Sequence, residues 1–263
     1  MCSAGERNKM IVTYSSKLYA KFLDLLIPSC YWTNPTIPIK AYLMGWTENE
    51  ADEYRLKYPY CHFVRFPLPK DILNDEILNK YTKEILLKRL KNRFIPPMTW
   101  YKIFLALHET MNQSILWVDA DTLIFQDIQP LFDKFAEYDI FCTYRPTHPD
   151  KMRIYSGVMG FASRPHVIKY LARCLTLGWD LVDERAIYHW GEQLAFYRGL
   201  ELTSDIKLYS LPDNEHSINK NTNAMILSSK NLGSDKDSQY LKMKEIFIQK
   251  EQEWTTSPSG LTQ

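Results

Sequence analysis

The sequence predicts an α/β protein with a mostly parallel central sheet flanked by helices. Short apolar runs alternate with longer segments of helical periodicity, which is the pattern of strands joined by crossover helices. One apolar run ends in two carboxylates, at the edge where open α/β sheets bind their ligands. The 263 residues suffice for one large core, and 45% hydrophobic with 24% charged residues is an ordinary globular composition.

The first half of the chain alternates between predicted strands and helices. Apolar runs predict strands over residues 10–14, 38–44 and 61–66, and Pro67 and Pro69 end the last of them. Apolar residues at helical spacing predict helices over residues 18–27, 72–90 and 98–111. Pro96 and Pro97 separate the last two helices.

The second half repeats the alternation and ends in a different kind of segment. Extended segments are predicted over residues 114–118, 123–125, 140–144, 155–162 and 206–211, and helices over 167–177 and 191–197. We predict one domain over residues 1–227, followed by a linker, an amphipathic helix and a frayed tail over residues 228–263. Tyr240, Met243 and Phe247 recur at helical spacing, so this extension is expected to dock on the domain or, alternatively, on a partner.

Charge and cysteine usage limit the partners and the compartment. With 32 basic and 31 acidic residues the net charge is +1, which gives no electrostatic case for nucleic acid or an anionic membrane. The five cysteines have no paired spacing, so we expect free thiols in a reducing, cytoplasmic setting. The first ten residues contain no apolar stretch, so we expect no signal peptide, and nowhere do 18 apolar residues run together, so we expect no transmembrane segment.

The strongest chemical signal is the acidic pair Asp119 and Asp121. Four apolar residues, 115–118, form a predicted buried strand, and the pair follows where that strand leaves the sheet. Two carboxylates so close together repel each other and favour a cation, and hard oxygen ligands select Mg²⁺ or Mn²⁺. Such an ion would bridge the phosphates of a nucleoside diphosphate. A helix cap or a surface turn is the alternative interpretation.

Several blocks around this pair resemble a known family. They are TWYKI (99–103), LWVDADTLIFQDIQPL (116–131), YSGVM (155–159), HWGEQL (189–194) and PDNEH (212–216). In this order, over residues 9–220, they resemble the nucleotide-sugar glycosyltransferases of the GT-A fold, which is Rossmann-like. Within that fold they are most similar to family 8, which includes glycogenin and bacterial galactosyltransferases.

The resemblance implies a hexosyl- or pentosyltransferase that needs Mn²⁺ or Mg²⁺ and takes its sugar from a nucleoside-diphosphate sugar, UDP-linked, with retention. The acceptor would be a hydroxyl of a glycan, a protein or a small molecule. Residues 1–227 would form the GT-A-like catalytic domain. The resemblance also implies roles for single residues. Asp119, Ala120 and Asp121 would lie at the metal and the diphosphate, with Lys102 at the phosphates and His216 as a third metal ligand. Ser156 and Gly157 would contact the donor sugar, and Glu192 and Gln193 would lie beneath it.

The sequence also departs from the family and leaves alternatives open. Tyr155 stands where the family has Asn, Glu192 stands where it has Asp, and the family's His-x-x-Gly-x-x-Lys-Pro-Trp ending is absent. A non-catalytic nucleotide-sugar or carbohydrate-binding protein, and an inverting enzyme with Glu192 as general base, are therefore alternatives. A nucleotidyltransferase is a weaker one, because no glycine-rich basic loop follows the first strand.

Three single residues are open to two interpretations. Lys102 and His216 can be site residues or solvated surface side chains. Tyr14, which follows Thr13 at the end of the first strand, can stack on a nucleobase or lie in the core.

Overall fold

The computed structural model describes residues 9–66, 100–181, 191–218 and 220–256. The predicted helix over residues 72–90 and the predicted helix start at residues 98–99 lie outside this part of the chain. Within it, a seven-stranded sheet has the order β3-β2-β1-β4-β7-β6-β8. The strands are β1 (Lys9–Ser16), β2 (Ile39–Met44), β3 (Cys61–Phe66), β4 (Ser114–Val118), β6 (Ile140–Tyr144), β7 (Ile154–Phe161) and β8 (Leu208–Ser210).

The central sheet is mostly parallel, as predicted. β1 pairs in parallel with β2 and β4, β2 pairs in parallel with β3, and β6 does so with β8. Only β7, among these strands, runs antiparallel to its neighbours β4 and β6. Every residue of β4 and β7 is buried, which is why both read as nearly continuous apolar runs.

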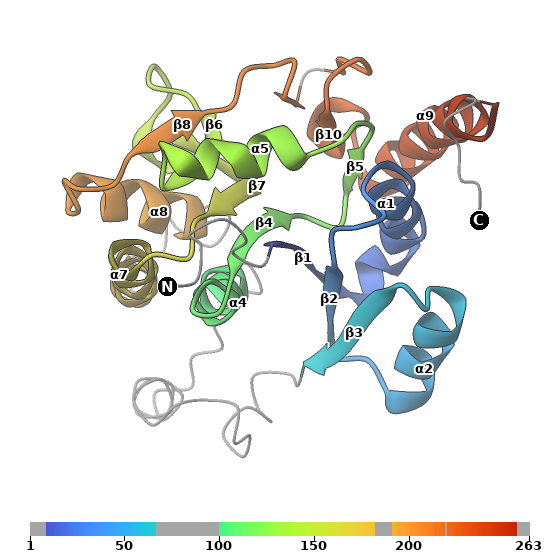
Figure 1. Ribbon diagram of the computed structural model, residues 1–263, viewed down its shortest axis with the longest axis horizontal. Coiled ribbons are helices and arrows are strands. Elements are labelled where there is room, and N and C mark those ends of the chain that lie inside the picture. Colours follow the sequence, from blue (N-terminus) through green and yellow to red (C-terminus); the bar gives the residue numbers. More distant parts are fainter. Residues whose placement is uncertain (1–8, 67–99, 182–190, 219, 257–263) are drawn as a thin grey trace, which may run out of the picture.

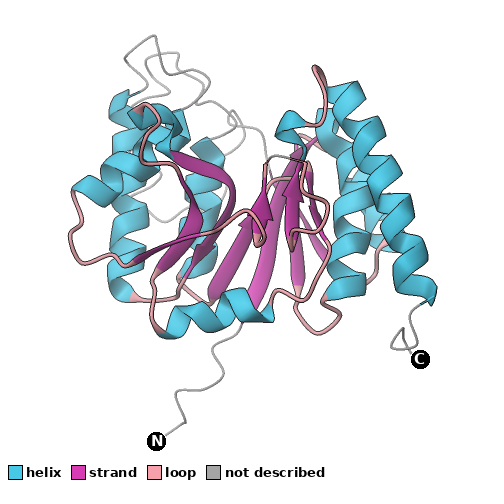
Figure 2. Ribbon diagram, turned by 90° about the horizontal axis from the view of Figure 1, so that it is seen from above, coloured by secondary structure: helices cyan, strands magenta, loops and turns pink. Residues whose placement is uncertain are grey.

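Helices cover both faces of the sheet (Figure 2). They are α1 (Ala20–Thr33), α2 (Glu48–Lys57), α4 (Trp100–Thr110), α5 (Gln129–Asp133), α6 (Asp150–Arg153), α7 (Pro165–Leu181), α8 (Gly191–Glu201) and α9 (Lys236–Thr256). The helix predicted to end at residue 27 continues through Pro28 to Thr33, because the apolar pattern continues through the buried Cys30. No helix in the described ranges is long and apolar enough to cross a membrane.

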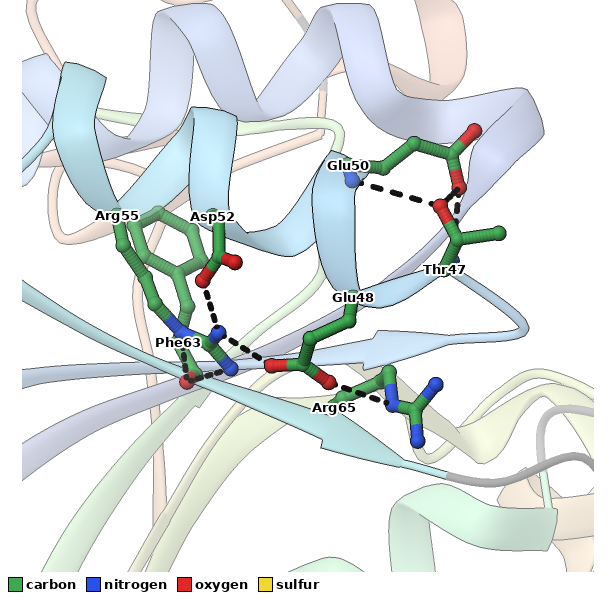
Figure 3. A network of polar contacts seen from close by, with 7 residues as sticks. All are labelled: Thr47, Glu48, Glu50, Asp52, Arg55, Phe63 and Arg65. Atoms are coloured by element: carbon green, nitrogen blue, oxygen red, sulfur yellow. Dashed lines mark hydrogen bonds and ion pairs between the residues drawn. The ribbon is translucent and has the colours of Figure 1, made fainter.

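Helix α2 was not predicted, although its sequence carries a start signal. Thr47 accepts a hydrogen bond from the amide of Glu50, and the Glu50 carboxylate accepts one from the amide of Thr47 (Figure 3). This reciprocal capping box starts the helix. Arg55 then joins α2 to β3 through the carbonyl of Phe63, and Glu48 pairs with Arg65 at 3.2 Å. The helix has a single buried residue, so its apolar periodicity is weak.

A second, three-stranded sheet extends the acidic turn. Its order is β5 (Thr122–Ile124), β10 (Ile226–Ser228) and β9 (His216–Ser217), with β10 antiparallel to β5. β10 crosses the predicted boundary between residues 227 and 228, and Ser229 and Leu232 beyond it are buried. The segment expected to be a linker is therefore packed against the domain. The division of the chain at this boundary stays a prediction.

The C-terminal helix docks on the domain, as its apolar spacing predicted. α9 lies beside α1 (Figure 1). The Tyr240 ring contacts Phe22 edge-on with centroids 5.5 Å apart, and Phe247 stacks on Trp32 at 5.4 Å. Met243 between them is fully buried. The helix begins at Lys236.

Candidate functional site

The sheet topology predicts a crevice beyond the carboxyl ends of β1 and β4. From β1 the chain builds outward to β2 and β3, and then returns to β4 on the other side of β1. Open α/β sheets bind ligands at such a switch point. A cavity of about 420 Å³ lies there. Its walls come from three parts of the chain and several single side chains. They are the end of β1 with the residues after it (Tyr14, Ser15, Ser16, Leu18, Tyr19), the acidic turn (residues 119–121), the C-terminal segment (Lys230, Lys236, Gln239), and Lys102, Tyr155, Glu192 and Gln193.

The acidic pair lies at this cavity, and each carboxylate is held by one of its two oxygens. Asp119 Oδ1 accepts hydrogen bonds from Lys102 Nζ at 2.7 Å and from Trp117 Nε1 at 3.1 Å. Asp121 Oδ2 accepts from Lys236 Nζ at 2.7 Å and from Ser229 Oγ at 2.8 Å. These contacts all go to Asp119 Oδ1 and Asp121 Oδ2. One oxygen of each acid therefore fixes the orientation of its carboxylate, and the other oxygen is the candidate ligand atom.

Electrostatics at Asp119 favour an added cation. Its partly buried position raises the pKa of the carboxyl above the usual value; the Lys102 ammonium opposes this, and the Asp121 carboxylate adds to the rise. A positive charge beside Asp119 would oppose this rise of its pKa. Two carboxylates at one turn are the hard-oxygen chemistry that Mg²⁺ and Mn²⁺ prefer, so the residues fit such an ion.

Lys102 links the acidic pair to the start of α8. It is 2% exposed, which rules out the alternative of a solvated lysine. Its Nζ donates to the Ser156 carbonyl at 3.0 Å and contacts Ser156 Oγ at 3.3 Å. Ser156 Oγ in turn donates to Glu192 Oε1 at 3.2 Å. One buried ammonium thus joins Asp119 to Glu192 through Ser156.

Glu192 and Gln193 bring two open hydrogen-bond acceptors to the cavity. They are 6% and 5% exposed, although both line the cavity. Glu192 Oε2 and Gln193 Oε1 have no hydrogen-bond partner among the described residues. A buried acceptor without a donor costs about 1–3 kcal/mol. A ligand that brings hydroxyl donors would remove this cost.

Tyr14 lines the cavity, whereas Thr13 lies beside it in the sheet. The Tyr14 ring lies 5.5 Å from Trp117, and burial, followed by the charges of Asp119 and Glu192, raises the pKa of its hydroxyl well above the usual value. The hydroxyl therefore stays protonated and can donate. Thr13 is fully buried, and its Oγ1 lacks a partner among the residues described.

Gly157 shapes the site through its backbone. Its carbonyl accepts the amide of Asp119 at 2.7 Å, which fixes the start of the acidic turn. A Cβ at this position would lie 2.6 Å from Tyr155 Cε1, so the glycine is required by the Tyr155 ring. Tyr155, 7% exposed, lines the cavity where the resembled family has Asn. Ala120 also lines the cavity. Ser156 does not line it, but its hydrogen bonds hold Lys102 and Glu192, which do.

His216 is not brought to the acidic pair. It is 1% exposed, which excludes a surface role, and it does not line the cavity. Nδ1 contacts Thr143 Oγ1 at 2.7 Å and Nε2 contacts Ser228 Oγ at 2.9 Å. Burial lowers its pKa to about 3, so the imidazole is neutral. The role of His216 as a third metal ligand stays a prediction. To bind a metal, the ring would have to give up its hydrogen bond to the Thr143 or the Ser228 hydroxyl. No group of three His, Cys, Asp or Glu in the part of the chain covered by the structure is arranged to hold a metal.

The C-terminal segment supplies site residues that the sequence analysis missed. Ser229 and Lys236 hold Asp121, and Lys230 and Gln239 line the cavity. One signal was available, because Lys236 begins a helix of 21 residues. A cation in the first turn opposes the helix dipole, so a lysine there suggests an acidic partner, but Asp237 in the same turn gives it a local one and the sequence does not identify Asp121.

Comparison with known proteins identifies the fold. No family model matches the chain, and no curated protein matches it either. Solved structures do match. The glycosyltransferase GlyE of Streptococcus pneumoniae TIGR4 aligns at a TM-score of 0.57 with 12% identity, over 98% of this chain and 66% of GlyE. The galactosyltransferase LgtC, in complex with donor and acceptor sugar analogs, aligns at 0.56 with 14% identity, over 95% of this chain and 97% of LgtC.

The chain has the GT-A fold. Mouse xyloside xylosyltransferase 1 is a further match, at a TM-score of 0.50 and 12% identity over 84% of this chain. At these identities the likeness establishes the architecture, which confirms the predicted fold class. The neighbours are glycosyltransferases, but family 8 in particular is not shown.

Proposed function

We propose that this protein is a glycosyltransferase that moves a hexosyl or pentosyl group from a UDP-sugar to an acceptor hydroxyl. The observation that carries the proposal is the pair of open acceptors, Glu192 Oε2 and Gln193 Oε1, in a cavity that ends on the acidic pair. Sugar hydroxyls are the donors that such acceptors lack. The aromatic ring of Tyr14, which also lines the cavity, supports a nucleobase beside it.

A divalent cation, Mn²⁺ or Mg²⁺, forms part of the proposal. Asp119 Oδ2 and Asp121 Oδ1 would hold it, and the bound ion would neutralise charge on the leaving diphosphate. Formal charge supports binding of metal and nucleotide as a pair. Three lysines (102, 230, 236) and three acids (119, 121, 192) line the cavity, so 3 − 3 gives a net charge of zero. A metal ion with charge +2 and a nucleotide sugar with charge −2 leave the cavity neutral when both are bound, whereas either one alone leaves a net charge of two.

We propose transfer with retention of the anomeric configuration. Glu192 is tied through Oε1 to Ser156, and the neighbouring Gln193 carries an amide, which can orient or stabilise the sugar but is a weak base. A second candidate is an inverting enzyme. The free Glu192 Oε2 supports it, because that oxygen could accept the proton of an acceptor hydroxyl.

A cytoplasmic location is supported by the cysteines. Cys30, Cys61, Cys142 and Cys174 are free and buried, as expected in a reducing compartment. The acceptor is therefore to be sought among cytoplasmic glycans, proteins and small molecules.

The test is a panel of nucleotide sugars with Mn²⁺, read by thermal shift and by release of free nucleoside diphosphate without acceptor. We expect UDP-sugars to raise the melting temperature and to be hydrolysed slowly. A rise without any release would indicate a non-catalytic nucleotide-sugar-binding protein. If no nucleotide sugar changes the melting temperature, the proposal is wrong.

A further inference from the structure

The first residue of α9 occupies a cation position at the acidic pair. Lys236 Nζ lies 2.7 Å from Asp121 Oδ2, on a carboxylate whose side chain is 15% exposed. A lysine at the start of a helix is unfavourable by itself, because the positive end of the helix dipole repels it. The ion pair with Asp121 offsets that repulsion, so the ammonium is most stable on this oxygen when no other cation is near.

The helix holds the lysine stem in place and leaves its ammonium movable. Tyr240 on Phe22 fixes the first turns of α9 against α1. The Lys236 ammonium lies 5.0 Å from the centroid of the Tyr19 ring, and its side chain is 48% exposed. A lysine carries rotatable donors on a flexible stem. It can therefore leave one anion for another inside the cavity while its Cα stays fixed.

Building on the proposed function, we propose that Lys236 competes with the metal for Asp121 and then binds the donor diphosphate. In the empty site its ammonium neutralises Asp121. A divalent ion on Asp121 Oδ1 would put a second cation on the same carboxylate, and its repulsion of the Lys236 ammonium weakens the ion pair. The diphosphate that arrives with the metal offers the ammonium new oxygens. Lys236 would then make binding of metal alone weak and binding of the metal–nucleotide pair strong.

The test measures Mn²⁺ binding without nucleotide, from the free Mn²⁺ signal in electron paramagnetic resonance. Lys236→Met keeps the length of the stem and removes the charge. We expect it to bind Mn²⁺ alone on the order of tenfold tighter than the wild type, because a like charge is gone. Lys236→Arg keeps the charge and should stay within about twofold. Lys242→Met is the matched control, since Lys242 is exposed on the same helix and does not line the cavity.

UDP binding at saturating Mn²⁺ gives the second arm. Lys236→Met should bind UDP on the order of tenfold more weakly, whereas the control should match the wild type. Unchanged or weaker Mn²⁺ binding in Lys236→Met would overturn the competition. Unchanged UDP binding would overturn the role at the diphosphate. If the wild type binds no UDP in Mn²⁺, the proposed function itself fails, and the Mn²⁺ arm still decides the competition.

A measurement on the wild type covers the case in which Lys236→Met does not fold. Acetic anhydride labelling, read by mass spectrometry, should modify Lys236 less than Lys242 in the empty protein. Mn²⁺ alone should raise labelling of Lys236, and Mn²⁺ with UDP should lower it again. Labelling of Lys236 that does not respond to Mn²⁺ would contradict the proposal.

Discussion

UDP should stabilise this protein strongly in Mn²⁺ and weakly without it. The cavity is formally neutral, since three lysines face three carboxylates. Without metal, the diphosphate must enter beside Asp119 and Asp121 with its charge uncompensated. We expect its affinity then to fall by a factor on the order of 10², within the usual range of site-to-site coupling.

The size of the effect follows from mass action. UDP at 100 times its dissociation constant in Mn²⁺ adds about 2.7 kcal/mol to the free energy of unfolding. A hundredfold weaker complex at the same UDP concentration adds only about 0.4 kcal/mol. At roughly 2–4 °C per kcal/mol for a chain of this size, the melting temperature should rise by about 5–11 °C with Mn²⁺ and by about 1–2 °C in EDTA.

The assay is a thermal melt at fixed UDP, in Mn²⁺ and in EDTA. Mn²⁺ without UDP is the control for stabilisation by metal alone. The variant Asp121→Asn should reduce the Mn²⁺-dependent part of the shift, because an amide oxygen is a weaker ligand than a carboxylate. An equal UDP shift with and without metal in the wild type would refute the reasoning from charge balance and the metal assignment to the acidic pair.

Three further predictions address single residues. Asp119→Ala and Asp121→Ala should each lower turnover by a factor on the order of 10²–10³ with the fold kept by circular dichroism; outright unfolding would make the pair structural. Glu192→Gln should keep measurable transfer, and proton NMR of the product should show the donor's anomeric configuration; an inverted product, or lost activity with intact donor binding, would make Glu192 the base. His216 has a folded-state pKa of about 3, below its unfolded value, so folding loses stability as pH falls below about 6.5. Urea unfolding from pH 6.5 to 5 should show a loss of about 2 kcal/mol that His216→Gln lacks; equal pH dependence in both proteins would rule out a buried neutral imidazole.

The sequence predicted the elements whose packing is local and strongly apolar. β4 was predicted with its observed bounds, because a fully buried strand reads as an unbroken apolar run. The position of the acidic pair followed from that strand and from the sheet topology. α2 was missed because its start signal, Thr47 and Glu50, is polar and its buried face is a single alanine.

The parts of the site that come from distant segments could not be predicted in the same way. Lys236 meets Asp121 across 115 positions of the chain, and no local pattern specifies that contact. The resemblance implied His216 as a third metal ligand, and no local pattern predicts that the second sheet turns its ring toward Thr143 and Ser228. Contacts of this kind are set by tertiary packing, which a propensity or a spacing does not encode.

The pairing of β5 with β10 has a consequence for the order in which the site can form. Residues Thr122–Ile124 directly after the acidic pair are hydrogen-bonded to Ile226–Ser228, more than 100 positions later. Until that late segment has been synthesised, the backbone of β5 is an open strand edge, available for wrong pairing. Completion of the acidic turn is therefore a late, long-range step, and a chain shortened before residue 226 should aggregate during synthesis even though the strands of its central sheet are all present.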